Sequence, residues 1–412
     1  MLVGGLVCQN DERVILSVSK KALLAWQIGD GRGHISKLRT IGESLKLHGF
    51  VCSAALTDLE HADELKDVTA SIRRVSQLPY FHGLRAQAGY PPAATYGEFL
   101  GDVGFASTSI IAQHLTYWRD VLQAERPDVV IAEQAPTALL AARSLSIPSV
   151  ALGTTYTLPP TNLKMFPVLL KEFTHRKWSE SEMCEAISAA IDQFHLPPLH
   201  HLAELYTADV SLPVGIKLLD PYAHHRVEKR IPPNVGDRPL DKPWTRERNE
   251  VFAYLSTGNR FDAMTVDALA KLPVPLRVYV AGADQDSVSK LRAKGIRVEG
   301  KPVSPFQIAR RSRVIFHAGS YGTMCLGIRA GVPQVTAPQQ LEQLFNARSL
   351  ERAGGGCCIE PNDGAIYFDR IVETYENVET RSRAVDLAIE TGPEFLGKPG
   401  EMSSAQILRL VS

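Results

Sequence analysis

The chain has 412 residues, of which 44% are hydrophobic and 22% charged, so it has the composition of a soluble globular protein and the length for two domains. Lysine plus arginine and aspartate plus glutamate both number 45, so the basic excess typical of nucleic-acid-binding proteins is absent. Six cysteines without CxxC spacing argue against a zinc ribbon or a disulfide scaffold and favour a reducing cytoplasm.

Strands and helices alternate through the first half of the chain. An apolar run that stops at Gly29 is typical of a buried strand, and the apolar residues after it recur at helical spacing until His48 and Gly49. The predicted elements are strands at 22–28, 50–56, 127–132 and 149–153, with helices across 35–45 and 137–145. This alternation predicts a parallel sheet with helices on both faces.

Prolines then crowd residues 213–250, and because proline removes a backbone donor, this stretch is predicted to be a linker rather than interior strand. A second α/β series follows, with strands predicted at 251–256, 276–281, 296–299, 313–317, 334–337 and 357–360. We therefore predict an α/β protein of two Rossmann-like domains, 1–235 and 236–412. The last helix, near 403–410, is a candidate to pack back on the first domain.

The segment 29–34 (GDGRGH) lies between a predicted strand and helix. Glycines there let the backbone approach a ligand, and a helix N-terminus offers free N–H groups to an anion. A dinucleotide fingerprint has glycine at the sixth position, where this chain has His34, which argues against a nicotinamide or flavin site. From the residues alone, His34 is either a titratable group at a ligand-binding turn or a histidine that only begins a helix.

A second turn, 317–323 (HAGSYGT), also follows a strand and opens a helix, which again builds an anion site. Downstream lie GVP at 331–333 and PQQLEQLFNA at 338–347. Taken singly, Glu342 and Gln343 would be the solvated start of an amphipathic helix. The combined spacing favours a binding site instead.

Residues 317–347 resemble the donor-binding signature of GT-B-fold, UGT-like glycosyltransferases, including the bacterial macrolide glycosyltransferases: H-x-G…[GST]-[TS]…G-V-P…P-x-x-x-[DE]-Q-x-x-N-A. The resemblance implies two Rossmann-like domains whose parallel sheets face a central cleft. It also implies an inverting transferase that moves a hexose from a UDP- or dTDP-linked sugar to a hydroxyl of a small-molecule or lipid acceptor.

By this resemblance, His34 would be the catalytic base, and Glu133, which ends a predicted strand, would orient it. Glu133 is one methylene longer than the usual aspartate, and it could equally be a carboxylate satisfied by the backbone of a helix N-terminus. His317 and the N–H groups around Gly322 and Thr323 would hold the diphosphate, while Glu342 and Gln343 would bind sugar hydroxyls. The implied donor-binding residues are Gly33, Thr257, Val303, His317, Gly319, Ser320, Gly322, Thr323, Glu342 and Gln343.

Two features qualify the expected chemistry. The family often has a ribose-binding glutamate where this chain has Leu326, so recognition of the ribose is expected to differ. No DxD pair follows a predicted strand, so neither a metal nor a cofactor beyond the nucleotide sugar is expected. The alternatives are a GT-B-fold hydrolase or epimerase of the sugar nucleotide, and a non-catalytic glycosyltransferase partner that keeps the fold. Retention of His34, Glu342 and Gln343 argues against the last.

The acceptor side is expected between 80 and 185. Aromatic residues there either shape an acceptor pocket or belong to the core, and 90–104 is predicted to be a mobile loop over the pocket. No window of 18 uncharged apolar residues is present, and charges at 11–13 interrupt the apolar run that a signal peptide needs. We therefore expect a cytoplasmic protein, peripheral to the inner membrane if the acceptor is a lipid.

Overall fold

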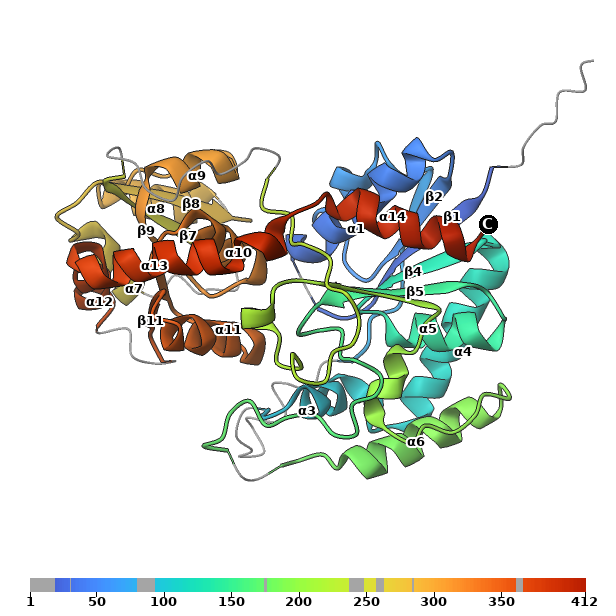
Figure 1. The fold of residues 1–412 in the computed structure, drawn as a ribbon. Coiled ribbons are helices and arrows are strands. Elements are labelled where there is room, and N and C mark those ends of the chain that lie inside the picture. The colour runs from blue at the N-terminus through green and yellow to red at the C-terminus, as the bar shows by residue number, and fades with distance from the viewer. Residues whose placement is uncertain are drawn as a thin grey trace, which may run out of the picture.

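Two parallel β-sheets, each flanked by helices, make up the computed structural model (Figure 1). It describes residues 19–29, 31–79, 93–173, 176–236, 248–256, 263–283, 285–360 and 366–412. Each sheet has its own core, and the two halves of the chain meet through side-chain contacts. The predicted pair of Rossmann-like units is confirmed.

The first sheet has the strand order β3-β2-β1-β4-β5-β6, and every pair is parallel. This is the strand order of dinucleotide-binding α/β folds, in which ligands bind beyond the carboxyl ends of the strands. Its strands are β1 (Lys21–Trp26), β2 (Val51–Leu56), β3 (Ser71–Arg74), β4 (Val129–Glu133), β5 (Ser149–Thr154) and β6 (Val210–Val214). Its helices are α1 (Arg32–Leu47), α3 (Tyr96–Leu100), α4 (Thr108–Glu125), α5 (Pro136–Ser144) and α6 (Glu180–Asp192).

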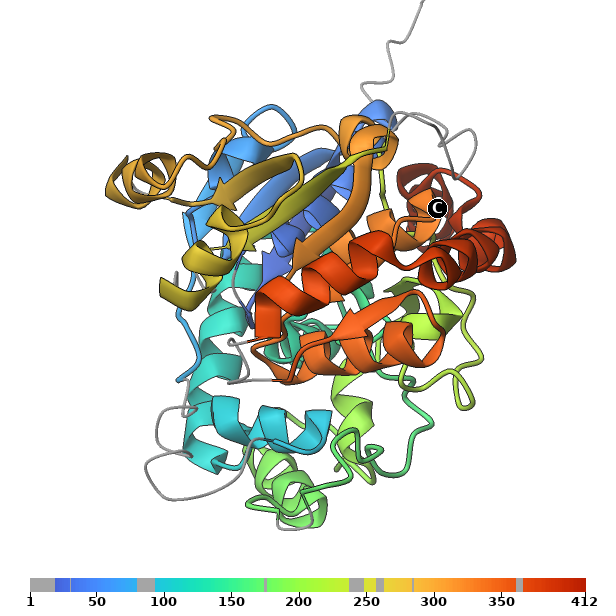
Figure 2. The same ribbon diagram turned by 90° about the vertical axis from the view of Figure 1, so that its left-hand side faces the viewer.

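The second sheet has the order β11-β10-β9-β7-β8 and is also parallel. Its strands are β7 (Glu250–Ser256), β8 (Leu276–Ala281), β9 (Ser312–His317), β10 (Gln334–Thr336) and β11 (Gly356–Cys358). The helices are α7 (Ala263–Ala270), α8 (Gln285–Ala293), α9 (Pro305–Arg311), α10 (Tyr321–Ala330), α11 (Leu341–Arg352), α12 (Tyr367–Glu376), α13 (Val378–Thr391) and α14 (Pro399–Leu410). Figure 2 shows this half of the chain from its outer side.

The strand predicted at 296–299 is wrong. This segment makes one isolated bridge, between Val278 and Val298, at the β8 edge of the second sheet. Two backbone hydrogen bonds attach it, from Val278 N–H to Arg297 O (3.0 Å) and from Glu299 N–H to Val278 O (2.8 Å). The apolar run is short, and Gly300 and Pro302 follow at once, so the pairing does not extend into a strand.

The linker was predicted to begin too early. Pro213 lies within β6, the edge strand next to β5. Proline is tolerated in an edge strand, because on the outer side of the strand a missing N–H breaks no hydrogen bond of the sheet. The Pro213 carbonyl accepts a hydrogen bond from Ile231 N–H (2.8 Å), so part of the proline-rich stretch still pairs with the edge. Residues 237–247, within the predicted linker, lie outside the described part of the chain.

The C-terminal helix α14 returns from the second half of the chain to lie along α1 (Figure 1). The buried hydroxyl of Ser44 donates to that of Ser404 at 2.8 Å, and Ile407 is fully buried in the core around α1. A Cβ at Gly400 would lie 2.9 Å from the Thr40 carbonyl oxygen, so the two backbones approach closely. No described helix combines the length and the apolar character that a membrane span requires.

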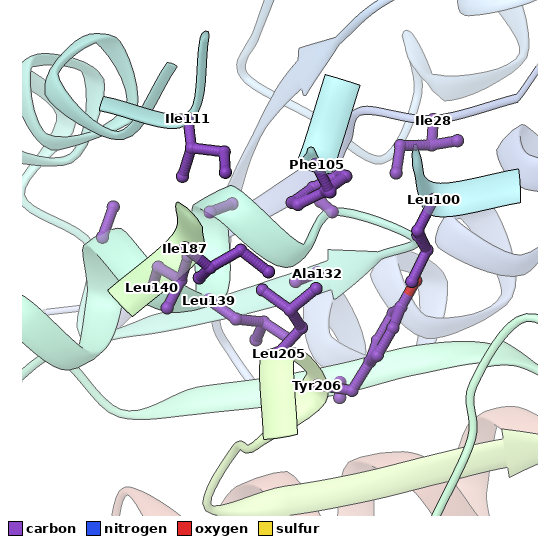
Figure 3. Close-up of a cluster of buried hydrophobic side chains, with 14 of the residues drawn as sticks. Ile28, Leu100, Phe105, Ile111, Ala132, Leu139, Leu140, Ile187, Leu205 and Tyr206 are labelled. Carbon is purple, nitrogen blue, oxygen red and sulfur yellow. The ribbon is translucent and has the colours of Figure 1, made fainter. Parts of the chain in front are cut away.

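The prediction of a mobile loop at 90–104 is wrong for its described residues, 93–104. Helix α3 ends at Leu100, and a wide helical turn over Gly101–Phe105 follows it, with non-helical backbone at Val103 and Gly104. Leu100 and Phe105 are fully buried in the same hydrophobic cluster as Ala132 of β4 (Figure 3). Buried carboxylates hold the segment: Glu98 accepts the N–H groups of Ala94 (2.9 Å) and Lys177 (2.8 Å). Of the aromatic residues predicted as either pocket or core, Tyr96, Phe105, Trp118 and Phe166 are buried in the core.

Candidate active site

The carboxyl edge of the first sheet brings His34 and Glu133 together. Glu133 ends β4 and is the register partner of Trp26, the last residue of β1; the chain turns after β1 and begins α1 at Arg32. His34 therefore lies in the first turn of α1, with its Nδ1 2.5 Å from Oε2 of Glu133. The imidazole stacks on the Trp26 indole, with ring centroids 4.7 Å apart. The longer glutamate thus reaches the histidine.

The contact fixes which nitrogen of His34 is free. A carboxylate is an acceptor only, so Nδ1 of the neutral ring carries the proton, and Nε2 has the lone pair that a general base needs. Both oxygens of Glu133 face side chains of α1, since Lys37 Nζ lies 3.0 Å from Oε1. These contacts favour the orienting interpretation of Glu133 over that of a carboxylate satisfied by a helix N-terminus.

Glu133 is fully buried and remains ionised. Burial by itself raises the pKa of the carboxyl, but the nearby His34 and Lys37 outweigh burial, and the net pKa lies below the ordinary value. An ionised carboxylate in contact with the imidazole is the arrangement that stabilises an imidazolium when the ring takes a proton.

Gly29 makes room for the ring of His34. Its φ is +92°, and a Cβ at this position would lie 2.6 Å from Nε2. We expect Gly29→Ala to lower kcat/KM by at least about tenfold, because it strains the turn and displaces the nitrogen that would act as base. Steady-state kinetics would measure this, with Gly49→Ala as control: Gly49 has φ +80°, but a Cβ there would meet no atom within 4 Å. Equal losses in both variants would contradict a local effect.

The second turn follows β9 in the other sheet, and His317 organises it. His317 is buried; its Nδ1 accepts the N–H of Gly319 (3.0 Å), and its Nε2 donates to Oε1 of Gln334 (2.8 Å). Burial lowers its pKa to about 4, so the ring is neutral. Because both nitrogens have partners within the chain, His317 here shapes the turn. Its predicted direct contact with a diphosphate stays a prediction.

The turn packs against the start of α11, which carries the predicted sugar-binding pair. A Cβ at Gly319 would lie 2.9 Å from the Gln343 carbonyl oxygen, and Gly319 has φ +90°. Ser320 is the N-cap residue of α10 and donates its hydroxyl to that of Thr323 (3.2 Å). The free N–H groups of the first helical turn, at Gly322 and Thr323, therefore gather at this edge. The structure thus brings most of the predicted donor residues together.

Glu342 reaches across to the first half of the chain. Its Oε1 accepts a hydrogen bond from the hydroxyl of Thr154, the last residue of β5, at 3.1 Å. Burial raises its pKa, and the charges of Lys37 and His34 lower it only partly. A second contact joins the two halves nearby: the Tyr321 hydroxyl accepts the N–H of Ile216 (3.1 Å). Glu342 is therefore within electrostatic range of the pair formed by His34 and Glu133.

The remaining predicted residues are placed as follows. The Gln343 side chain accepts the N–H of Gln339 (2.9 Å), Gly33 is exposed in the first turn of α1, and Val303 packs against the core around Phe252. Thr257 lies outside the described residues. Leu326 is buried in that same core, so no side chain at its position offers a carboxylate to a ribose.

The pKa of Glu342 is raised, whereas that of Glu133 is lowered, so ionisation of these two buried carboxyls should have opposite effects on the stability of the fold. The folded pKa of Glu342 lies above the ordinary 4.5, so ionisation of this group costs stability as pH rises past that value. We expect Glu342→Gln to raise the melting temperature at pH 7, an effect that disappears below pH 4.5. Thermal unfolding across pH would show it, and Glu43→Gln, at an exposed position on α1, is the control. A lowered melting temperature at pH 7 would contradict the assignment.

Three residues of the site were missed in the sequence. Lys37 follows His34 by three positions on a helix, and this spacing alone could have identified it. Thr154 and Tyr321 carry no such signal, because their roles depend on how the two halves face each other. In the described residues, no three His, Cys, Asp or Glu side chains are grouped so that they could hold a metal ion.

Comparison with known proteins supports the predicted resemblance. No family model matches the chain. A "PGL/p-HBAD biosynthesis glycosyltransferase" of Mycobacterium tuberculosis is 26% identical over 332 residues, which cover 74% of this chain and 76% of that protein.

The solved structures that are similar share the fold over nearly their full length. The calicheamicin glycosyltransferase CalG4 has a TM-score of 0.68 at 17% identity, covering 95% of this chain and 98% of its own. The spinosyn rhamnosyltransferase SpnG has a TM-score of 0.64 at 17% identity, covering 93% of this chain and 98% of its own. SpnG has been solved with thymidine diphosphate and with spinosyn aglycone. The GT-B fold expected from the resemblance is confirmed.

Proposed function

We propose that this GT-B-fold glycosyltransferase moves a hexose from a nucleotide-diphosphate sugar to a hydroxyl group of a small-molecule or lipid acceptor, with inversion at the anomeric carbon. The observation that carries the proposal is the contact between His34 Nδ1 and Glu133 Oε2, at 2.5 Å, within electrostatic range of Glu342 on α11. It supplies a base with a free Nε2 near a candidate sugar-binding carboxylate.

In the proposed reaction, Nε2 of His34 accepts the acceptor's hydroxyl proton as its oxygen attacks the anomeric carbon. Glu133 stabilises the resulting imidazolium. The bond from the anomeric carbon to the diphosphate oxygen breaks, and the departing charge is stabilised by the N–H groups at the start of α10, around Gly322 and Thr323. Attack from the face opposite the leaving group inverts the configuration, and neither a metal nor a further cofactor is required.

A UDP- or dTDP-linked sugar is the proposed donor. The support is the GT-B fold, the thymidine diphosphate bound by SpnG, and a second turn built to receive an anion. For the acceptor, the support is the aglycone bound by SpnG and the biosynthetic name of the mycobacterial relative. The described cysteines are all free, in keeping with the proposed cytoplasmic location, which would be peripheral to the inner membrane for a lipid acceptor.

The test is a product assay with a panel of UDP- and dTDP-hexoses, each with and without a panel of hydroxyl acceptors. Glycosylated acceptor with the inverted anomeric configuration supports the proposal. Free sugar or an epimerised nucleotide sugar formed equally without acceptor would favour the hydrolase or epimerase. Binding of nucleotide sugars without turnover on any acceptor would favour a non-catalytic partner.

Donor recognition can be tested separately by calorimetry. We expect Glu342→Ala and Gln343→Ala to weaken binding of the nucleotide sugar more than that of the free nucleoside diphosphate, because both side chains would contact only the sugar. Each lost hydrogen bond to a buried hydroxyl should cost about 1–3 kcal/mol. Gln339→Ala, an exposed neighbour, is the matched control. Equal losses for both ligands would overturn the roles of Glu342 and Gln343.

A further inference from the structure

Lys37 is a cation of the site that the proposed mechanism does not use. It lies one turn after His34 on α1, and its side chain is only 16% exposed. Its Nζ donates to the Gly33 carbonyl oxygen at 3.0 Å and lies 3.0 Å from Oε1 of Glu133. The ammonium group is therefore held in place by the backbone of its own helix and points at the carboxylate that contacts His34.

Glu133 is thus shared between two residues of α1, with Oε2 against His34 and Oε1 against Lys37. The last torsion of a glutamate side chain has broad preferences, so one contact leaves the carboxylate plane free to turn. Here the hydrogen bond of Oε2 with His34 and the ion pair of Oε1 with Lys37 together restrict that plane. Residues three apart lie on the same face of a helix, so α1 can present both partners to a single carboxylate.

The charge of Lys37 acts on Glu133, because it helps to hold the pKa of this buried carboxyl below its ordinary value. Other groups interact with Glu133 electrostatically: Glu342 from α11, and Tyr96 and Tyr206 from the first half of the chain. Burial raises the pKa of both phenols, so they stay neutral.

We propose that Lys37 is a positioning residue: it holds Oε1 of Glu133 so that Oε2 is aimed at Nδ1 of His34. In this orientation Nε2 of His34 is left free to accept a proton from the acceptor. This inference rests on the proposed role of His34, and its test is chosen to give an answer whether or not transfer is observed.

The test follows the tautomer of the neutral His34 ring by NMR in the full chain, with His34→Ala used to assign the signals. In wild type the nitrogen shifts should report protonation mainly at Nδ1, the atom that contacts Glu133. In Lys37→Met they should move toward a mixture with the tautomer protonated at Nε2, because the carboxylate is free to turn away from Nδ1. Lys37→Gln, which has no charge to engage Oε1, should show a similar change, and Lys37→Arg should stay near wild type. The control is Lys46→Met on the same helix, whose Nζ donates to the Asp67 carbonyl oxygen instead.

Kinetics provide the second measurement. Lys37→Met and Lys37→Gln should each lower kcat/KM by about tenfold and leave nucleotide affinity unchanged, because neither side chain has a charge to engage Oε1. An unchanged His34 tautomer in folded Lys37→Met, or in Lys37→Gln if the former does not fold, would overturn the inference. So would activity that falls only in step with melting temperature. If the wild type transfers no sugar, the proposed function fails while the NMR result still stands.

Discussion

His34→Ala should lower transfer to an alcohol by about 10²–10⁴-fold, the usual cost of losing a general base. The reason is local: Nδ1 is committed to Glu133, and Nε2 is the nitrogen left to accept a proton. Nucleotide affinity should hardly change, because the turn predicted to bind the diphosphate is held together by contacts within the second half of the chain, such as His317 to Gln334. Steady-state kinetics together with calorimetry on the nucleoside diphosphate would measure both quantities.

A purely structural histidine would behave differently, since activity would fall in step with stability. His114 provides the comparison: it is buried on α4, and burial lowers its pKa, so it is neutral like a core residue. His114→Ala should lower the melting temperature with no change in the pH profile, whereas His34→Ala should remove the acidic limb from its residual activity. If His34→Ala kept full transfer activity, or if it no longer bound the nucleotide, the catalytic base would have to be assigned to another residue.

Local patterns account for the parts of the structure that the sequence predicted well. Helix α1 was predictable because its buried residues recur every three or four positions and Gly49 follows its end. The contact between His34 and Glu133 was predictable because His34 follows β1 and Glu133 ends β4, and the carboxyl ends of these parallel strands share one edge of the sheet. Each inference needed only near neighbours and the general form of the fold.

The errors arise where distant contacts decide the structure. Residues 93–105 have loop-like composition, yet Tyr96–Leu100 form a helix and the turn after it is buried. Distant partners hold this segment: Glu98 accepts the N–H of Lys177, and Asp102 accepts the indole N–H of Trp178. The hydrogen bond from Thr154 to Glu342 joins residues 188 positions apart. No local pattern encodes such pairs, since they depend on how separate elements dock. His317 illustrates the same limit: a histidine at this turn predicts an anion-binding side chain, but its ring is hydrogen-bonded to the side chain of Gln334.

Glu133→Gln should lower kcat/KM by about 10²-fold, less than His34→Ala, because the geometry survives while the charge that stabilises the imidazolium is lost. It should also destabilise the fold by about 3 kcal/mol at pH 7, since Lys37 would be left beside a buried neutral group. The folded pKa of Glu133 lies below the ordinary 4.5, so its stabilisation is present above that value and is lost as pH falls through the folded pKa. The stability difference between wild type and variant should vanish in acid.

Glu133→Asp separates charge from reach. Aspartate keeps the charge but is one methylene shorter, so it cannot hold both the 2.5 Å contact with His34 and the 3.0 Å contact with Lys37. We expect its kcat/KM to fall between wild type and Glu133→Gln, with a melting temperature closer to wild type than that of Glu133→Gln. Kinetics and thermal unfolding on the three proteins would establish the order. If Glu133→Gln kept full activity, the carboxylate would be structural, and His34 would need no charged partner to act as a base.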